Sequence, residues 1–561
     1  MHELLVNRAA RRALLIILST ALAGLFILSS PGRADETPAK RPNIVLILAD
    51  DLGWSDLGCY GSEISTPNID RLAASGTRFT QFYNGARCCP TRAALLTGLY
   101  AHTAGVGHML QDWHPPSYTH GLLKNTATIA ELLHAAGYHT YHVGKWHVGG
   151  ADRGDRPNHP MNRGFDHAYG TGGGGGFFDL QPLYADREYV KPGEGFYATD
   201  AFTDHAVQFL DEHARDHHAP DNNDAPFFLH LCYTAPHFPL HAKPEDIAKY
   251  RGHYREGWDR LRERRFARQK ELGLLSPETK LSRRDPVCKA WDELPAAERE
   301  EWDLRMAVYA AMIDCMDQGV GRVMEAVDRM GARDNTLVLF LSDNGSSAEA
   351  LNSWPNPARG HKPGVETGAP GSHRCLEIGW ASAANTPFRM HKMWDHEGGI
   401  STPLVACWPA GIAARGTLTT EVGHIIDLMP TLLEVAGTSY PAQLGDRTLP
   451  PLAGQSLVKA LTGGRIGSRT LGWEHEGNRA IRMGDWKLVA EFRGPWELYN
   501  LAEDRSETNN RASTEPERVK DMAAAWQAWA DNVGVVPWED LPGSKYKPSA
   551  GYSRKSEFVA P

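Results

Sequence analysis

The chain contains 561 residues, with 59 Lys and Arg against 68 Asp and Glu and a formal net charge of −9. Hydrophobic residues make up 42% and charged residues 23%, which excludes a disordered chain, a collagen-like chain and a polytopic membrane protein. The negative charge offers no general attraction to nucleic acid, so an anionic substrate must meet a local cluster of positive charge.

Residues 1–34 have the pattern of a signal peptide. A group of arginines precedes the apolar run from Ala13 to Ser29, and the small residue Ala34 stands at the expected cleavage point. We therefore expect an exported protein, periplasmic or secreted, with no stable membrane insertion after cleavage. The alternative is a retained anchor, because the apolar run is close to the about 17–25 residues that span a bilayer.

Short apolar runs then alternate with helix-like stretches. The runs Ile44–Ala49 and Thr336–Ser342 have the length and composition of strands that are buried on both faces of a parallel sheet. The other expected elements are, in chain order, a helix over Ile129–Ala136, strands over Tyr138–Val143 and Phe227–Tyr233, and a helix over Asp303–Met330. This alternation predicts an α/β fold with a mostly parallel central sheet.

Two segments depart from the alternation. Glu245–Arg299 is dense in charge, which is typical of a solvated helical insertion; a cap over the rim of an active site is the alternative. Ala480–Val489 and Trp496–Leu501 have the pattern of short antiparallel strands. We therefore expect a large domain over residues 41–464, a smaller C-terminal α+β subdomain over 465–545 and a polar tail over 546–561.

The two runs that resemble buried strands both end in oxygen-donor side chains. Because the carboxyl ends of parallel strands meet at one edge of a sheet, Asp50, Asp51, Asp343 and Asn344 are expected to converge. Three carboxylates and an amide suit a hard cation such as Ca²⁺ or Mg²⁺. Turn chemistry is the alternative, because Asp and Asn commonly follow strands. The repetition of the pattern favours the metal site.

A cysteine-containing segment, RCCPTRAALLTG, occupies residues 87–98. Pro90 suits the first turn of a helix, so Cys88 is expected at a helix N-terminus, where free N–H groups and the dipole favour an anion. Arg92 lies four residues on and shares the helical face. The pattern predicts a nucleophile beside an anion-binding cation. A buried structural thiol and a disulfide between Cys88 and Cys89 are the alternatives.

The pattern C-x-P-x-R followed by Leu-Thr-Gly resembles the signature of the type I, formylglycine-dependent sulfatases, arylsulfatases among them. Cys88, not Cys89, matches the position that this family oxidises, and Thr91 stands where Ser is commoner. The resemblance spans roughly residues 42–510 in the family's order. Its further motifs are Asp50-Asp51-Leu52-Gly53, Gly144-Lys145-Trp146-His147, Pro236-His237, Ser342-Asp343-Asn344-Gly345, Lys392 with Glu397-Gly398-Gly399, and Gly484-Asp485-Trp486-Lys487-Leu488.

The resemblance implies an alkaline-phosphatase-like large domain and hydrolysis of sulfate esters to an alcohol or phenol and sulfate. The nucleophile would be the hydrate of formylglycine (3-oxoalanine) made from Cys88. The resemblance also implies the metal ligands, which would hold Ca²⁺ in preference to Mg²⁺: Asp50, Asp51, Asp343, Asn344 and the group derived from Cys88.

The same resemblance implies roles for the basic residues. Arg92 and Lys145 would hold the formylglycine and the sulfate, and His147 would stand beside the hydrate as a hydrogen-bond partner or base. His237, as general acid, and Lys392 would flank the leaving oxygen. The resemblance thus implies that Lys145, His237 and Lys392 would contact the substrate.

The implied partners are a small-molecule or carbohydrate sulfate ester and a formylglycine-generating or equivalent maturation enzyme, with no nucleic acid. Two alternatives remain. One is a phosphonate or phosphate ester hydrolase of the same superfamily, which shares the motif and the metal site. The other is an inactive homologue that binds sulfated glycans.

Two further sequence features could border the site. Residues 170–175 spell G-x-G-x-x-G, but Pro182 follows soon and no helix is expected, so a loop at the rim of the active site is favoured. His475 could face the pocket from the C-terminal subdomain. A structural turn is as well supported, so His475 is not placed in the predicted site.

Overall fold

The computed structural model describes residues 40–150, 156–217, 225–350, 362 and 364–542. The fold below is that of the unit that begins at residue 42. The predicted signal peptide and polar tail lie outside the described residues. Within the described ranges, no helix combines the length and apolar character needed to cross a membrane.

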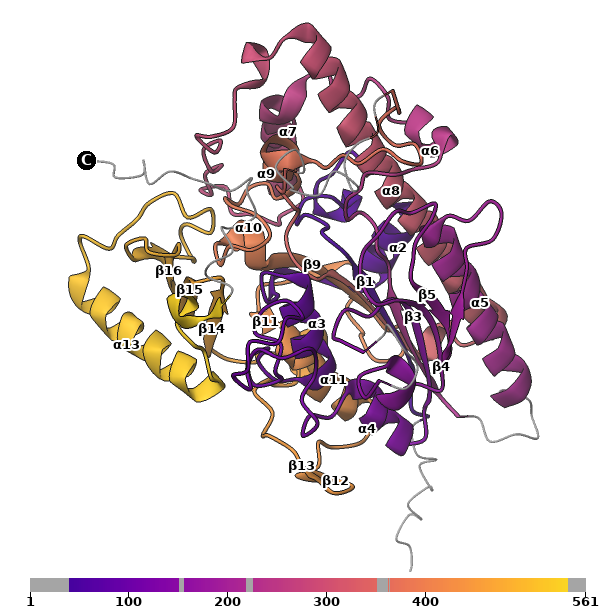
Figure 1. Ribbon diagram of the computed structural model, residues 1–561. Helices are drawn as coiled ribbons and strands as arrows, with labels where there is room; N and C mark the ends of the chain where they lie inside the picture. The colour runs from indigo at the N-terminus through magenta and orange to yellow at the C-terminus, as the bar shows by residue number, and fades with distance from the viewer. Residues whose placement is uncertain (1–39, 151–155, 218–224, 351–361, 363, 543–561) are drawn as a thin grey trace, which may run out of the picture. The chain divides into compact units, whose positions relative to one another are not determined.

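An eleven-stranded sheet forms the centre of this unit (Figure 1). Its strand order is β10-β2-β9-β8-β1-β7-β3-β4-β5-β6, and β11 pairs with β2. β8, β1, β7, β3 and β4 run parallel, whereas β9 runs antiparallel to both β8 and β2. The strands are β1 (Asn43–Ala49), β2 (Thr77–Tyr83), β3 (His139–Lys145), β4 (His167–Thr171), β5 (Leu183–Ala185), β6 (Glu188–Val190), β7 (Phe227–Cys232), β8 (Thr336–Ser342), β9 (Ser401–Cys407), β10 (Thr417–Thr419) and β11 (Gly423–His424).

Alternate side chains of β1 enter two different apolar clusters. Val45 and Ile47 pack on the side of α2, α5 and α8, and Ile44, Leu46 and Leu48 pack on the side of α3, α4 and α11. Helices therefore cover both faces of the sheet, which explains why its strands are continuous apolar runs. The predicted α/β fold is confirmed. These helices are α2 (Pro67–Ser75), α3 (Cys88–Thr97), α4 (Ile129–Ala135), α5 (Ala198–His217), α8 (Ala296–Arg329) and α11 (Leu428–Val435).

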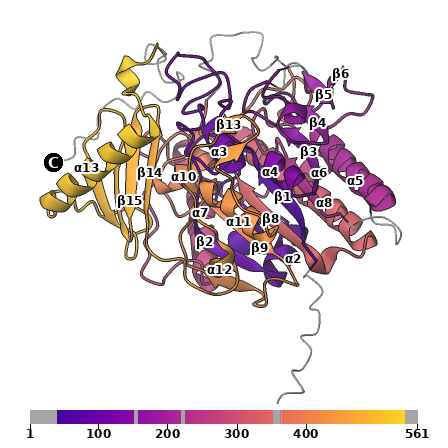
Figure 2. The ribbon, with the colours of Figure 1, turned by 90° about the horizontal axis from the view of Figure 1, so that it is seen from below.

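A second, four-stranded antiparallel sheet lies near the C-terminus (Figure 2). It consists of β14 (Thr470–His475), β15 (Asn478–Met483), β16 (Trp486–Ala490) and β17 (Glu497–Asn500). Ile481, Leu488 and Leu498 pack with Met522 of α13 (Pro516–Val533). The predicted small antiparallel sheet is thus present. Shorter elements elsewhere are α9 (Glu377–Ala384), α10 (Glu397–Ile400), β12 (Gln443–Leu444), β13 (Arg447–Thr448) and α12 (Val458–Leu461).

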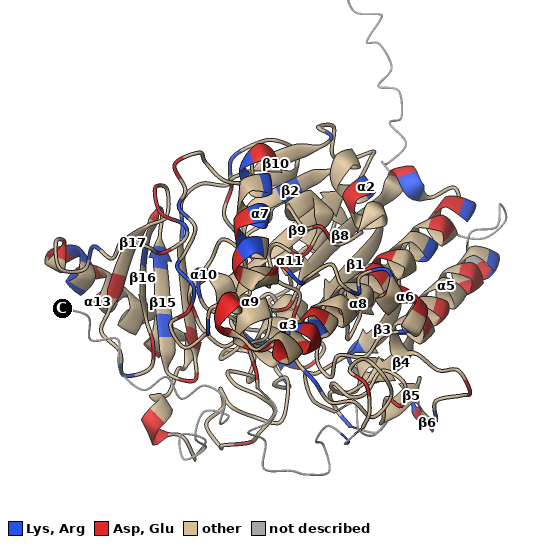
Figure 3. Ribbon diagram, turned by 90° about the horizontal axis from the view of Figure 1, so that it is seen from above, with Lys and Arg blue, Asp and Glu red and all other residues tan. Residues whose placement is uncertain are grey.

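The charged insertion is exposed to solvent on one face and packed against the rest of the protein on the other. It contains α6 (Pro244–Ala248) and α7 (Gly257–Glu271), and Figure 3 shows acidic and basic residues along α7. Trp258 is buried and its ring lies 5.5 Å from that of Trp380 in α9. Arg265 is buried too, because its charge is paired inside the protein with Asp56 at 2.6 Å. Charge density alone therefore overstated the exposure of this segment.

Candidate active site

Two acidic segments meet at the carboxyl edge of the central sheet. β1 and β8 pair in parallel with Ala49 opposite Ser342, so the residues that follow them leave the sheet side by side. Asn344 Nδ2 donates to Asp51 Oδ1 at 2.7 Å. The backbone N–H of Asp51 donates to Asp343 Oδ1 at 3.3 Å. The structure thus brings Asp51, Asp343 and Asn344 together, with Asp50 adjacent in the chain.

Three cations from distant parts of the chain each pair with one of these carboxylates. The ion pairs are Lys145–Asp50 at 2.6 Å, Arg92–Asp343 at 2.7 Å and Lys392–Asp51 at 2.9 Å. All six side chains are at most 2% exposed. An anion that enters here meets fixed positive charges in a low-dielectric setting, where electrostatic attraction is strong.

The pKa values of Asp50 and Asp343 are shifted in opposite directions. Burial raises the pKa of Asp50, but Lys145 and then His237 outweigh it and hold that pKa below its ordinary range. Burial and the charge of Asp50 raise the pKa of Asp343 well above its ordinary range, against the effect of Arg92. Buried carboxylates repel one another, and a divalent cation bound between them would relieve that repulsion.

Two oxygen atoms test whether the site fits a metal ion. Asp50 Oδ1 and Asn344 Oδ1 are buried and have no hydrogen-bond partner. Buried polar atoms are nearly always satisfied, so these two atoms point to a missing partner. Carboxylate and amide oxygens are the donors that Ca²⁺ takes, whereas Zn²⁺ favours Cys and His. The donor set therefore fits a hard cation.

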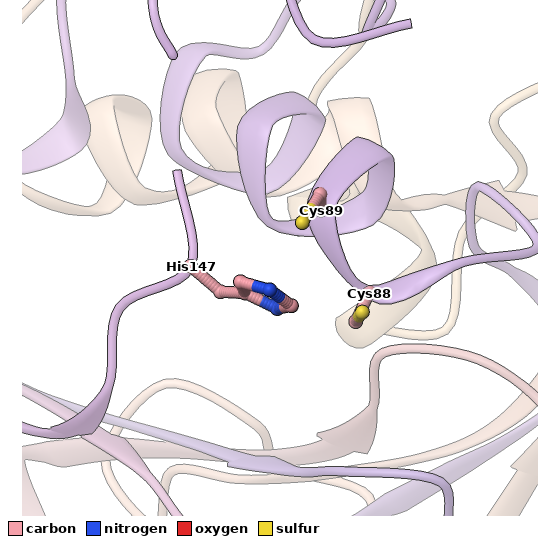
Figure 4. Close-up of side chains that lie close together, drawn as sticks. All are labelled: Cys88, Cys89 and His147. Atoms are coloured by element: carbon pink, nitrogen blue, oxygen red, sulfur yellow. The ribbon is translucent and has the colours of Figure 1, made fainter. Parts of the chain in front are cut away.

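Cys88 is the first residue of α3, and the helix ends at Gly98 in the left-handed conformation. Figure 4 shows Cys88, Cys89 and His147 facing a common space; the two Sγ atoms and a ring nitrogen of His147 lie within 4.8 Å of one another. The two cysteines form no disulfide. A hydrogen bond from the Cys89 thiol lowers the pKa of Cys88 well below its ordinary value against burial, and Lys145 adds to the effect. Cys88 is therefore the more readily ionised thiol.

Several residues of the site have strained backbones. Asp51, His147 and Met393 have φ angles of 67°, 57° and 86°, in the region that non-glycine residues avoid. Such strain collects at functional sites, where the surrounding structure enforces it. Met393 follows Lys392 directly, so each of these strained positions either is a predicted site residue or adjoins one.

His237 and the glycine-rich loop border the site. His237 Nε2 lies 3.6 Å from Asp51 Oδ2, and His237 Nδ1 donates to the Phe238 carbonyl at 2.5 Å. The loop follows β4 without a helix, as expected. A Cβ placed on Gly174 would lie 3.5 Å from the ring of His237, and one on Gly173 would lie 3.9 Å from that of His147. The loop therefore lies beside both histidines.

Sequence reasoning missed two charged residues of this region. Glu349 is buried and contacts Lys392 Nζ at 3.4 Å and Arg87 Nη2 at 3.3 Å. Arg87 directly precedes Cys88 and stood in the motif without an assigned role. Glu349 belongs to none of the matched motifs, and its only signal was a carboxylate in the loop that follows Asp343.

The central sheet between two helical layers, with a buried acid–base cluster at its carboxyl edge, defines an alkaline-phosphatase-like α/β protein. A family model described as Sulfatase matches residues 42–438, and one described as N-sulphoglucosamine sulphohydrolase, C-terminal, matches residues 388–525. The chain belongs to the sulfatase family, a family of sulfuric ester hydrolases.

Individual relatives agree with this assignment. An uncharacterised sulfatase of Schizosaccharomyces pombe is 34% identical over 550 residues, covering 90% of this chain and 96% of the relative. An arylsulfatase of Klebsiella aerogenes is 32% identical over 462 residues, covering 78% and 96%. Among solved structures, Ps i-CgsB in complex with k-i-k-neocarrahexaose is similar with a TM-score of 0.65 and 27% identity, covering 92% of this chain and 99% of that one.

Proposed function

We propose that the protein hydrolyses sulfate esters, releasing an alcohol or phenol and inorganic sulfate, with a nucleophile made from Cys88. The observation that supports this most directly is the position of Cys88, at the start of α3 and beside Lys145, His147 and the buried carboxylates. A helix N-terminus and several fixed cations suit an anionic sulfate group.

The site would use two groups that the amino-acid chain does not itself carry. Asp50, Asp51, Asp343, Asn344 and the oxidised Cys88 would hold Ca²⁺, which when bound acidifies a nearby hydroxyl and neutralises charge on sulfuryl oxygens. Formylglycine, made from Cys88 by a maturation enzyme, supplies in hydrated form a nucleophilic hydroxyl and a second hydroxyl that lets the sulfate depart.

Lys145 and Arg92 supply positive charge to the site. Burial disfavours the charged form of Lys145, but Asp50 outweighs burial and raises the pKa of Lys145, so its ammonium group stays protonated. Burial by itself would lower the pKa of Arg92, but the acidic partner Asp343 outweighs burial, and the pKa of Arg92 is raised. Lys145 and Arg92 would therefore bind the sulfate and stabilise the negative charge that gathers on its oxygens in the transition state.

The two histidines would move protons. Burial lowers the pKa of His147, so its ring is neutral near neutral pH, and its buried Nδ1 has no hydrogen-bond partner. A neutral imidazole beside the nucleophile can accept a proton. His237 is more exposed and lies next to Asp51, where it would donate a proton to the leaving oxygen, with Lys392 beside it. We also propose export, with residues 1–34 removed.

The test compares two substrates and examines Cys88 directly. Enzyme purified from its native host should hydrolyse 4-nitrophenyl sulfate with a higher kcat/KM than bis(4-nitrophenyl) phosphate. Mass spectrometry of the tryptic peptide Cys88–Arg92 should show the aldehyde in place of the thiol. A strong preference for the phosphodiester would favour the phosphate ester hydrolase. An unmodified thiol in all molecules, with no turnover, would favour the glycan-binding homologue.

A further inference from the structure

The hairpin turn between β14 and β15 carries a residue that such turns disfavour. His475 pairs with Asn478, so Glu476 and Gly477 are the two central residues, and their φ angles are 52° and 80°. Two left-handed residues are typical of a type I′ turn, where Asn-Gly is strongly preferred. Glu at the first position is strained, which indicates that its carboxylate is needed for something other than the turn.

The carboxylate of Glu476 lies near three basic side chains, one of which donates a hydrogen bond to it. His108 Nε2 donates to Glu476 Oε1 at 3.0 Å, His475 Nε2 lies 3.7 Å from the same oxygen, and Arg87 Nη1 lies 3.8 Å from it. Burial opposes ionisation of Glu476, but His108 and the neighbouring charges lower its pKa to about 2. The strained turn therefore presents an ionised carboxylate.

This group of charges continues into the proposed active site. Arg87, which contacts Glu476, directly precedes Cys88 and also pairs with Glu349 at 3.3 Å. Glu349 in turn lies 3.4 Å from Lys392 Nζ. A chain of alternating charges thus runs from Lys392 to the turn of the C-terminal sheet.

Solvent reaches these side chains, whereas it does not reach the floor of the site. The side chains of Arg87, His108 and Glu476 are 13%, 12% and 16% exposed, while those of the Lys145–Asp50 pair are fully buried. A sulfate held at Cys88 must be attached to a leaving group that extends toward solvent. Arg87 directly precedes Cys88 in the chain, and Arg87, His108 and Glu476 are all partly exposed polar groups.

The group also has unused hydrogen-bonding atoms. Both ring nitrogens of the fully buried His475, Nδ1 of His108 and Nε of Arg87 have no hydrogen-bond partner. The rings of His108 and His475 stack at 5.3 Å with an interplanar angle of 13°. One possible ligand atom from each of His108, His475 and Glu476 lies within 4.8 Å of the others, but His108 Nε2 is already hydrogen-bonded to Glu476 Oε1.

The chemistry of these side chains matches a hydroxyl-bearing ring. A carboxylate, an imidazole and a guanidinium group together accept and donate hydrogen bonds to neighbouring hydroxyl groups. The ring of Trp113 stacks on that of His108 at 4.7 Å and adds an aromatic surface next to them.

We propose that Arg87, His108 and Glu476 recognise the hydroxyl groups of the leaving group, so that the preferred substrates are sugar sulfates and not simple aryl sulfates. His475 is a positioning residue that packs behind Glu476. This inference rests on the proposed hydrolysis of sulfate esters and assigns its leaving-group specificity.

The experiment uses Glu476→Gln, Glu476→Asn and a control, Asp446→Asn. Asp446 is an exposed acidic residue in the two-residue turn between β12 and β13, so the control removes the same charge from another hairpin. The measured quantity is the ratio of kcat/KM for mono-O-sulfated galactose, glucose and N-acetylgalactosamine to kcat/KM for 4-nitrophenyl sulfate. The latter leaving group has no neighbouring hydroxyls.

The wild type should favour at least one sugar sulfate, and both Glu476 variants should lower this ratio by about 10-fold or more, as expected for lost hydrogen bonds to a charged group. Asp446→Asn should leave it unchanged. Asn suits the turn, so Glu476→Asn should melt at a higher temperature than Glu476→Gln while losing the same specificity. If Glu476 had only a structural role, the variant with the lower melting temperature would also lose more of its specificity.

The outcomes separate the two proposals. A wild-type enzyme that hydrolyses 4-nitrophenyl sulfate but prefers it to every sugar sulfate overturns this inference and leaves the proposed function in place. If the ratio of kcat/KM for sugar sulfates to that for 4-nitrophenyl sulfate is unchanged in both Glu476 variants, this inference is likewise overturned and the proposed function stays in place. A mature enzyme that hydrolyses neither kind of sulfate ester contradicts the proposed function itself.

Discussion

Two clusters of buried charge follow β1, one around Asp50 and Asp51 and the other around Asp56. Asp56 pairs with Arg265 at 2.6 Å and accepts hydrogen bonds from the Tyr309 hydroxyl at 2.7 Å and the Gly53 N–H at 2.9 Å. Arg265 also pairs with Glu63 at 2.8 Å. The side-chain polar atoms of these residues all have partners.

The cluster at the edge of the sheet is different, because Asp50 Oδ1 and Asn344 Oδ1 are buried without partners. A buried ion pair whose atoms are all satisfied holds segments together and requires nothing else. A buried charge cluster with unsatisfied oxygens is complete only when another group binds. The comparison therefore distinguishes a structural cluster from the one that we propose to be functional, although both contain acidic and basic residues at similar depth.

The largest expected effect is on catalysis. Cys88→Ala should lower kcat for 4-nitrophenyl sulfate by about 10³-fold or more, because the nucleophile is lost and the remaining groups act only as a unit with it. Its melting temperature should stay close to that of the wild type. Cys407→Ala, which removes a buried thiol at the end of β9, is the control and should keep its turnover. Full activity of Cys88→Ala would refute the assignment.

The structural cluster should instead respond in stability. Arg265→Met should lower the free energy of unfolding by about 3–5 kcal/mol, because Asp56 and Glu63 lose their shared buried partner. Arg268→Met on the same helix removes an exposed pair with Glu271 and should cost about 0.5 kcal/mol or less. Urea unfolding measures both values. Equal effects of the two substitutions would contradict the distinction.

Metal binding should distinguish the two clusters directly. Ca²⁺ at about 100 times its Kd should stabilise the folded protein by about 2.7 kcal/mol, and EGTA should reverse the rise in melting temperature. Asp50→Asn should weaken or abolish this Ca²⁺-dependent shift. Asp56→Asn should lower the melting temperature but keep the shift. Thermal melts with and without Ca²⁺ measure this independently of activity, and a shift retained in Asp50→Asn would argue against the metal site.

The smallest expected effect concerns the pH dependence of stability at Glu476. Its pKa is lowered from an ordinary 4.5 to about 2 in the folded protein, so the stability it contributes is present above about 4.5 and disappears as the pH falls toward 2. Wild type should exceed Glu476→Gln by about 1 kcal/mol at neutral pH, a figure reduced for its partial exposure.

Urea unfolding of the two proteins at neutral pH and near pH 3 measures this difference. The advantage of the wild type should shrink in acid. A constant difference across this range would show that Glu476 does not contribute through its charge.

Much of the fold was predictable because it depends on residues close together in the sequence. The apolar runs of β1 and β8 and the acidic residues that follow them indicate two buried strands and their polar edge. Pro90 in the first turn and Gly98 beyond the last fix the limits of α3 in the same local way. The long helix α8 begins earlier than expected, at Ala296, because its first turns are charged and carry no apolar period.

By itself, therefore, the sequence determined the α/β fold, the family and the positions of Cys88 and the acidic pairs, since motif order and apolar patterning suffice for these. Only the tertiary structure decided that Arg265 is buried with Asp56, 209 residues away, and that Glu349 and Glu476 approach Arg87 beside Cys88. The reason is physical. The cost of burying a charge depends on which partner the whole chain brings to it, and no local pattern of residues encodes that partner.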